Sequence, residues 1–276
     1  MTAPAEQRVR HRRRVTGRRA AIASVAALGL TGAAIATTSL LSTAGAAVTW
    51  PTAKGSKAVS STIKVSGTYD GKLKKFLAKG ALGDGSQDED QDPIFELADG
   101  AVLKNVIIGV PGADGVHCKG SCTLKNVWWL DVGEDAVSFK GKSPKAVYKV
   151  IGGGARKASD KVFQFNGAGK LSITGFKVRN FGKLVRSCGN CSKQYKRTIT
   201  LSDIDATAPG KSLVGVNQNY GDTATLSRIR IHGDPKKKLK VCTRFQGNSS
   251  GKEPRTLGSG PYGTTCKYKS SDITYK

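Results

Sequence analysis

The chain has 276 residues, of which 38% are hydrophobic and 7% aromatic, and it carries 34 Gly and a formal net charge of +25. The apolar content is sufficient for a buried core, so the high charge does not make this a fully disordered chain. A single Met beside many Gly, Ser, Thr and Val residues is typical of turn-rich β structure and argues against an all-α protein.

The first 46 residues have the composition of an export signal, which we expect to be removed. Seven arginines lie within residues 1–19, and 27 uncharged residues follow them. Ala44-Gly45-Ala46 fits the small-x-small pattern of a cleavage site, and Arg18-Arg19 ahead of the apolar run indicates a twin-arginine signal. An uncleaved membrane anchor is the alternative, because the run is long enough to span a bilayer. Cleavage predicts a secreted, extracellular protein that consists of residues 47–276.

The basic character belongs to the exported part of the chain. Residues 47–276 contain 38 basic and 19 acidic residues, a formal charge of +19. Such a charge attracts polyanions, and those found outside cells are nucleic acid, anionic polysaccharide, and wall or membrane phosphate. Charge alone does not select among them, and a solvated basic surface that only aids solubility is a further alternative.

Short apolar segments recur through the middle of the chain. Six tetrads of the form apolar, polar, any, apolar are spaced by 21, 24, 25, 28 and 25 residues, and they begin at Leu103, Leu124, Tyr148, Ile173, Leu201 and Leu226. A second apolar strand follows each of the first five tetrads after 11 to 14 residues, at Val116, Val137, Val162, Leu184 and Leu213. Gly, Asn and Asp cluster between these strands, as is usual in turns.

This repeat predicts an all-β fold, a right-handed single-stranded parallel β-helix. The alternative is a β-sandwich. In a β-helix each coil lies on the next at the inter-strand spacing of about 4.8 Å, so equivalent residues of successive coils form columns. No further domain boundary is visible within residues 47–276.

All six cysteines lie in the exported part: Cys118, Cys122, Cys188, Cys191, Cys242 and Cys266. An oxidising environment favours disulfides, so we expect three bridges. The sequence does not determine their pairing, since six cysteines allow fifteen connectivities. A zinc site formed by the first four thiolates is the alternative, which export and the third, widely spaced pair argue against.

Acids precede the second strand of the first three repeats. Asp114, Asp135 and Asp160 stand two residues before the apolar anchors, and Glu134 lies beside Asp135. Stacked carboxylates repel one another unless a cation bridges them, and oxygen ligands suit calcium better than zinc. We therefore expect Asp114, Glu134 and Asp135 to bind Ca²⁺, whereas Asp160 is expected to cap a turn.

Basic residues gather around the same columns. Lys140 follows Val137 by three residues, and Lys161 and Lys183 stand immediately before apolar anchors, with Arg186 close behind. Alternation along the strand predicts that Lys140 and Lys161 point outward. Acids and bases on one face suit a uronic-acid polymer, although a single lysine is often only a solvated side chain.

At these residues the sequence resembles the pectate lyases of polysaccharide lyase family three, which are right-handed parallel β-helices. The resemblance covers roughly residues 48–270 and is carried by these segments: Ile94-Phe95-Glu96-Leu97, Leu103-Lys104-Asn105-Val106, Ala113-Asp114-Gly115-Val116-His117-Cys118-Lys119-Gly120, Cys122-Thr123-Leu124-Lys125-Asn126-Val127-Trp128-Trp129, Glu134-Asp135-Ala136, Ala158-Ser159-Asp160-Lys161-Val162-Phe163-Gln164, Phe181-Gly182-Lys183-Leu184 and Arg186-Ser187-Cys188-Gly189-Asn190-Cys191. Several motifs in one order are far more specific than any short pattern.

The resemblance implies calcium-dependent β-elimination on de-esterified polygalacturonate, with Asp114, Glu134 and Asp135 matching the metal-binding acids. It implies that Lys161 takes the C5 proton of the uronate, that Arg186 is catalytic, and that Lys140 and Lys183 bind substrate. Glu89 also matches a motif near the cleft and is a candidate substrate-binding residue. A lysine base must be neutral, so we expect Lys140, Lys183, Arg186 and calcium to lower its pKa and the pH optimum to be alkaline.

Two positions depart from the family pattern. Leu130 replaces an acid, and Gly133 replaces a cysteine, which puts the family's disulfide pattern in doubt. The loss of a bridge should reduce stability rather than activity.

Other functions remain as alternatives. A pectin hydrolase would need paired carboxylic acids, which the basic cluster disfavours. A non-catalytic β-helix protein that binds anionic polysaccharide is the main alternative. We expect no nucleic-acid partner, because most of the few aromatic residues lie at core positions of the repeats. We also expect a monomer with no stable membrane association after signal cleavage.

Overall fold

The structure, a computed structural model, describes residues 49–88 and 90–276. The predicted export signal and Glu89 lie outside the described residues. Ala47–Lys276 forms one compact unit, which contains every element given below.

The described residues form strands and three single-turn 3-10 helices. In chain order these are β1 (Ser56–Val59), β2 (Ile63–Val65), β3 (Thr68–Ala78), η1 (Gly80–Leu82), β4 (Phe95–Leu97), β5 (Ala101–Ile108), β6 (Val116–Cys118), β7 (Cys122–Trp129), β8 (Val137–Phe139), β9 (Val147–Ile151), β10 (Gly154–Phe165), β11 (Gly169–Thr174), β12 (Lys177–Ser187), β13 (Arg197–Asn217), η2 (Gln218–Tyr220), β14 (Thr223–His232), β15 (Lys240–Gln246), β16 (Arg255–Ser259), β17 (Cys266–Lys267), η3 (Ser270–Asp272) and β18 (Ile273–Tyr275).

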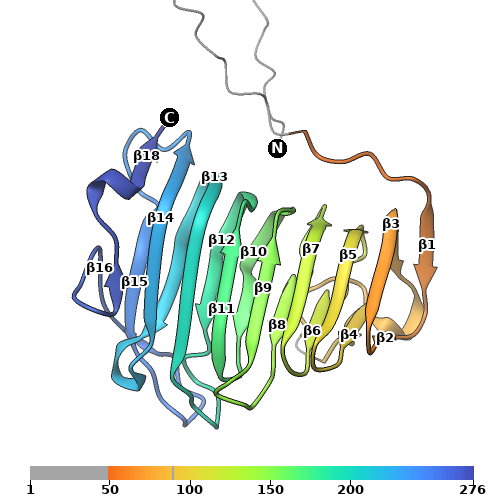
Figure 1. Ribbon diagram of the computed structural model, residues 1–276, viewed down its shortest axis with the longest axis horizontal. Coiled ribbons are helices and arrows are strands. Elements are labelled where there is room, and N and C mark those ends of the chain that lie inside the picture. Colours follow the sequence, from red (N-terminus) through yellow and green to blue (C-terminus); the bar gives the residue numbers. More distant parts are fainter. Residues whose placement is uncertain (1–48, 89) are drawn as a thin grey trace, which may run out of the picture. The chain divides into compact units, whose positions relative to one another are not determined.

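Strands of successive coils pair in parallel and build a solenoid (Figure 1). On the face that carries the site, β4 pairs with β6, β6 with β8, β8 with the end of β10, and β10 with β12. β13 and β15 continue this face, and β16 then pairs with β15 in the antiparallel direction. The predicted all-β parallel β-helix is confirmed.

The register differs from the predicted repeat at two places. Leu124 pairs with Val150, two residues beyond the predicted Tyr148, and Val137 pairs with Phe163 rather than Val162. Tyr148 and Val150 are both buried, so alternation alone does not distinguish a shift of two residues. The second difference accompanies a register shift between Ala158 and Lys161 in β10. Such irregularities cannot be read from an apolar pattern.

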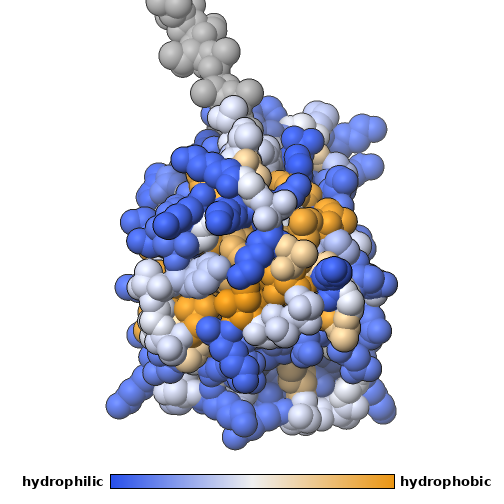
Figure 2. All heavy atoms as spheres, turned by 90° about the vertical axis from the view of Figure 1, so that its right-hand side faces the viewer, coloured by the Kyte–Doolittle hydropathy of each residue, from blue (hydrophilic) through white to orange (hydrophobic). Residues whose placement is uncertain are grey.

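Inward columns of apolar and aromatic side chains fill the solenoid. Phe139 and Phe165 of neighbouring coils pack edge to face with ring centroids 6.0 Å apart, and Phe165 packs in the same way against Tyr148 at 5.3 Å. All three are fully buried. Figure 2 views the end that carries β1 to β3 and shows apolar side chains in the middle of that face, with hydrophilic side chains around them. Strand pairing between the coils around this core sets the spacing of the outward columns.

Three disulfides form, as predicted: Cys118–Cys122, Cys188–Cys191 and Cys242–Cys266. The zinc alternative is wrong, because all six thiols are used in these bonds. In the part of the chain that the structure describes, no helix combines the length and apolarity needed to cross a bilayer.

Candidate active site

Three carboxylates meet in the turns that precede β6 and β8. Asp114 lies two residues before Val116, and Asp135 lies two residues before Val137, which pairs with Val116. Asp114, Glu134 and Asp135 are 5%, 7% and 2% exposed. One oxygen from each lies within 4.8 Å of the others. The predicted stacking of acids is therefore present, and its members are the three residues expected.

Two side chains on the outer face of β6 and β8 contact two of these carboxylates. The Nε2 of His117 donates to Asp114 Oδ2, and Ser138 Oγ donates to Asp135 Oδ2 over 3.4 Å. His117 and Ser138 pair in register and are both buried. Sequence reasoning missed them, although each directly follows an apolar anchor and therefore points outward.

Two oxygens in this cluster have no hydrogen-bond partner. They are Asp114 Oδ1 and Asp135 Oδ1, and both are inaccessible to solvent. A buried polar atom without a partner is costly, and a bound cation is one way to satisfy it. The donor set is made of carboxylate oxygens, which suits a hard divalent cation such as calcium.

Burial, together with the nearby charges of Glu134 and Asp114, raises the pKa of Asp135 well above its ordinary value, and Lys161 opposes this shift. Three buried carboxylates are thus poorly tolerated together without positive charge. A cation in this cluster would favour the ionised forms.

Lys161 supplies positive charge to the cluster. Its Nζ lies 3.5 Å from Glu134 Oε1 and 3.8 Å from Asp135 Oδ1, and it donates to Asp160 Oδ2 over 2.8 Å. Burial alone would lower the pKa of Lys161, but the carboxylates of Asp135, Asp160 and Glu134 outweigh burial and raise it. The sequence predicts that Lys140, Lys183, Arg186 and calcium lower this pKa; the side chains that contact Lys161 are carboxylates, and by themselves they shift the pKa in the opposite direction.

Asp160 does not cap a turn as expected. It accepts hydrogen bonds from Lys161 and Lys183, which pair in register on neighbouring coils. Burial would raise the pKa of Asp160, but these hydrogen bonds lower it to about 2. Val116, Val137 and Phe163 pair in register on successive coils. Asp114 and Asp135 stand two residues before Val116 and Val137, and Lys161 stands two residues before Phe163. Lys161 rather than Asp160 therefore continues the column of acids. Asp160 instead links the two lysines.

Lys140 lies at the other side of the cluster. Its Nζ is 3.0 Å from Nε2 and 3.3 Å from Nδ1 of His117, whose ring in turn contacts Asp114. The structure thus places Lys140 outward and next to the acids, as predicted, but its contact with them runs through His117.

Arg186 follows Lys183 on β12 and pairs with Gln164 on the coil before. It is 7% exposed, and its Nη1 donates to Ser187 O and to Asn217 Oδ1. Burial lowers the pKa of Arg186 to about 10, against the opposite effect of the Asp222 and Glu253 carboxylates. Arg186 therefore shares the face of Lys161 and Lys183 while its hydrogen bonds go to other residues.

A loop from residue 83 to residue 92 lies against the acidic turns, although Glu89 within it is outside the described residues. Gln87 Nε2 donates to Gly133 O, and the backbone N–H of Asp114 donates to Asp92 O over 3.3 Å. Gly133, which replaces the cysteine of the family pattern, contacts this loop closely: a Cβ there would lie 3.0 Å from Gly85 Cα and 2.2 Å from Ala113 O. No side chain fits at this position without movement of the backbone.

Comparison with known proteins agrees with this arrangement. The family profile described as pectate lyase matches residues 47–252. A probable pectate lyase E of Neosartorya fischeri is 52% identical over 221 residues, which is 79% of this chain and 84% of that protein. Pectate lyase E of Emericella nidulans is 51% identical over the same length, 79% of this chain and 83% of that protein.

Solved structures show the same family. The catalytic domain of pectate lyase PelI from Erwinia chrysanthemi superposes with a TM-score of 0.68 at 32% identity, covering 80% of this chain and all of that one. PelI in complex with tetragalacturonic acid gives a TM-score of 0.66 at 32% identity, over 79% of this chain and 70% of that one. The chain belongs to the pectate lyase family and is a polysaccharide lyase.

Proposed function

We propose that this pectate lyase cleaves de-esterified polygalacturonate by calcium-dependent β-elimination, with Lys161 as the base that removes the C5 proton. The observation that carries the proposal is the position of the Lys161 amine, within 4 Å of two of three buried, clustered carboxylates. PelI, which resembles this chain, has been solved with tetragalacturonic acid, and this supports an oligogalacturonate as the ligand.

Asp114, Glu134 and Asp135 would hold the calcium ion. Their support is the compact set of oxygens and the two buried oxygens, on Asp114 and Asp135, that lack a hydrogen bond. Hydrogen bonds from His117 and Ser138 orient the carboxylates of Asp114 and Asp135. When bound, calcium would neutralise the uronate carboxylate and so stabilise the charge that develops at C5.

Lys161 acts as base only in its neutral form. Its pKa is raised while Asp135, Asp160 and Glu134 carry uncompensated charge. Positive charge brought to these carboxylates therefore favours the neutral amine. In the reaction Nζ accepts the C5 proton, and the electron pair of the broken C5–H bond forms the C4–C5 double bond as the glycosidic oxygen leaves from C4.

Three further cations are suited to bind and polarise the polymer. Lys183 is partly exposed and aligned with Lys161, and Lys140 lies beside His117, so both can pair with uronate carboxylates. Arg186 would stabilise negative charge on the reacting uronate, since a guanidinium offers two parallel donors to a carboxylate. For Glu89, a substrate-binding role rests on the motif alone.

The catalytic domain corresponds to residues 47–276, and we propose that residues 1–46 direct export and are removed, which would yield a secreted monomer without stable membrane association. Nucleic acid is not a proposed partner: Trp129, Phe139, Tyr148, Phe163 and Phe165 are each at most 1% exposed and cannot stack on bases, and the Arg244 guanidinium lies against the exposed Tyr262 ring. Membership in a lyase family favours elimination over the hydrolase and the non-catalytic binder considered above.

The test is an assay on polygalacturonate with calcium, with a chelator, and with calcium restored. Elimination leaves an unsaturated sugar that absorbs ultraviolet light, whereas hydrolysis only releases reducing ends. The proposal predicts absorbing product with calcium, none with chelator, and recovery on addition of calcium. Reducing ends without absorbing product would indicate a hydrolase, and equal turnover in chelator would exclude the calcium requirement.

A further inference from the structure

The guanidinium group of Arg186 is enclosed on two sides. Its Nη1 donates to Asn217 Oδ1 over 3.0 Å and also to the carbonyl of Ser187. Its central carbon lies 3.9 Å from the centre of the Phe245 ring. Hydrogen bonds in the plane and an aromatic ring against the face together restrict both translation and rotation of a guanidinium.

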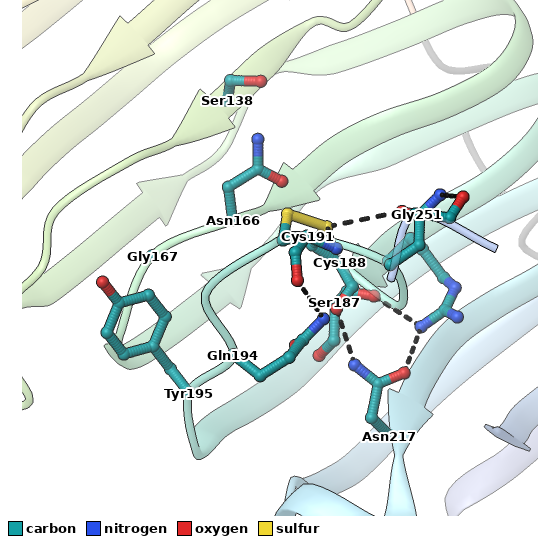
Figure 3. The surroundings of a disulfide bond; sticks show 12 residues. Ser138, Asn166, Gly167, Ser187, Cys188, Cys191, Gln194, Tyr195, Asn217 and Gly251 are labelled. Atoms are coloured by element: carbon teal, nitrogen blue, oxygen red, sulfur yellow. Dashed lines mark hydrogen bonds between the residues drawn. A yellow bond between two sulfur atoms is a disulfide. The ribbon is translucent and has the colours of Figure 1, made fainter. Parts of the chain in front are cut away.

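Asn217 is itself held firmly. It is fully buried, its Nδ2 donates to Cys188 O over 2.8 Å, and its backbone N–H donates to Asp222 Oδ2 over 3.0 Å. Figure 3 shows the Asn217 side chain beside the loop that the Cys188–Cys191 disulfide closes. Because the NH₂ group faces a carbonyl, the amide oxygen can only face Arg186. The orientation of the amide is thus fixed by its other partners.

The fold brings these groups together by register. Asn217 ends β13 and pairs with Phe245 of β15, one coil farther along the solenoid, while Arg186 comes from β12, one coil before. Gly215 pairs with Arg186, and a Cβ at this glycine would lie 2.8 Å from Arg186 Cδ. The position opposite Arg186 is therefore free of a side chain, which leaves room for the arginine to run across it toward Asn217 and Phe245.

We propose that Asn217 is a positioning residue for elimination, which acts by holding the Arg186 guanidinium against Phe245 at the face that carries Lys161 and Lys183. The inference rests on the proposed role of Arg186. Without the Asn217 amide, the guanidinium loses its side-chain acceptor and can leave the geometry needed to meet a uronate carboxylate.

The neighbouring residue offers a matched control. Gln218 Oε1 accepts a hydrogen bond of 2.7 Å from Arg244 Nη1, and the Arg244 guanidinium lies 3.6 Å from the Tyr262 ring centre. The surroundings of Arg244 thus resemble those of Arg186, because an amide oxygen and an aromatic ring contact one guanidinium. It holds a residue to which we assign no role in the reaction.

The experiment is a double-mutant cycle measured as kcat and KM on polygalacturonate. Asn217→Ala and Phe245→Leu are each made alone and combined with Arg186→Ala, and Gln218→Ala is the control. We expect Asn217→Ala and Phe245→Leu to lower kcat by roughly 10- to 100-fold, since misplacement of a catalytic group by about 1 Å has effects of this size. In the Arg186→Ala background the same changes should alter kcat by no more than about twofold. Gln218→Ala should retain wild-type kcat.

The cycle separates positioning from mere structural support. Equal loss of kcat with and without Arg186 would overturn the inference, because Asn217 would then act independently of the arginine. Wild-type kcat in Asn217→Ala would overturn it as well. Full activity of Arg186→Ala alone would instead remove the proposed role of Arg186, and the inference with it. If Asn217→Ala does not fold, the cycle with Phe245→Leu decides, since Phe245 is only partly buried.

Discussion

Substitution of Gly133 by alanine tests how the acidic turns are built. The new Cβ would lie 2.2 Å from Ala113 O and 3.0 Å from Gly85 Cα, and both of these are backbone atoms that cannot rotate away. Overpacking of this kind costs about 1 to 3 kcal/mol. For a domain of this size, this corresponds to a fall in Tm of roughly 2 to 12 °C. Since Glu134 follows directly, calcium affinity should fall by about tenfold or more.

The assay combines thermal unfolding with calorimetric titration of calcium. Gly67→Ala is the matched control, because Gly67 is exposed, lies outside the left-handed region of φ, and has no atom within 4 Å of the position that a Cβ would take. The control should change stability by no more than about 0.5 kcal/mol. A Gly133→Ala protein with the Tm and calcium affinity of the wild type would refute the close packing of the acidic turns.

Three further predictions follow from contacts around the site and on the outer sheet. Asp160→Asn removes one of the charges that raise the pKa of Lys161, so the pH at which activity rises should shift downward; an unchanged pH-rate profile would contradict this. His117→Ala should weaken calcium binding by about tenfold, as measured by titration, because Asp114 loses the partner that orients it. Hydrogen bonds from Arg230 hold the pKa of Asp205 at about 2, so this carboxylate stabilises the protein fully above pH 4 and less as the pH falls through 2. Asp205→Asn should therefore cost about 1 kcal/mol at pH 7 in urea unfolding, after allowance for solvent screening, and close to nothing at pH 2.

The outward columns could be predicted because a β-helix repeats its geometry from coil to coil. Asp114 and Asp135 stand at the same distance before equivalent apolar residues, so stacking of the coils alone brings them together. The same argument places Lys140 outward. These predictions used only the number of residues between a side chain and the apolar residue that begins the second strand of its repeat. In the first coils this number is the same from repeat to repeat.

The pattern fails where the backbone departs from regular pairing. The shift within β10 moves Lys161 into line with the carboxylates and leaves Asp160 between two lysines, which no count of apolar residues reveals. Lys183 pairs with Lys161 as a neighbouring cation, as predicted, but the position of Asp160 between the two ammonium groups was not.

Contacts between coils also could not be predicted from the sequence. Asn217 meets Arg186 over a separation of 31 residues, and Cys242 bonds to Cys266 over a separation of 24 residues, one of the pairings that the sequence left open. Both depend on which strands become neighbours after the register is set. The sequence predicts only that His117 and Ser138 point outward. Their contacts with Asp114 and Asp135 could not be predicted.

Replacement of Lys161 tests the central claim most directly. Lys161→Ala is compared with Lys157→Ala, which removes a lysine of the same strand that pairs with Asp131 at the surface. At saturating calcium, formation of unsaturated product should fall by about 10²- to 10⁴-fold in Lys161→Ala and stay unchanged in Lys157→Ala. Calcium affinity of Lys161→Ala should be at least that of the wild type, because an ammonium no longer competes for the carboxylates. Turnover by Lys161→Ala at the rate of the wild type would contradict its role as the base.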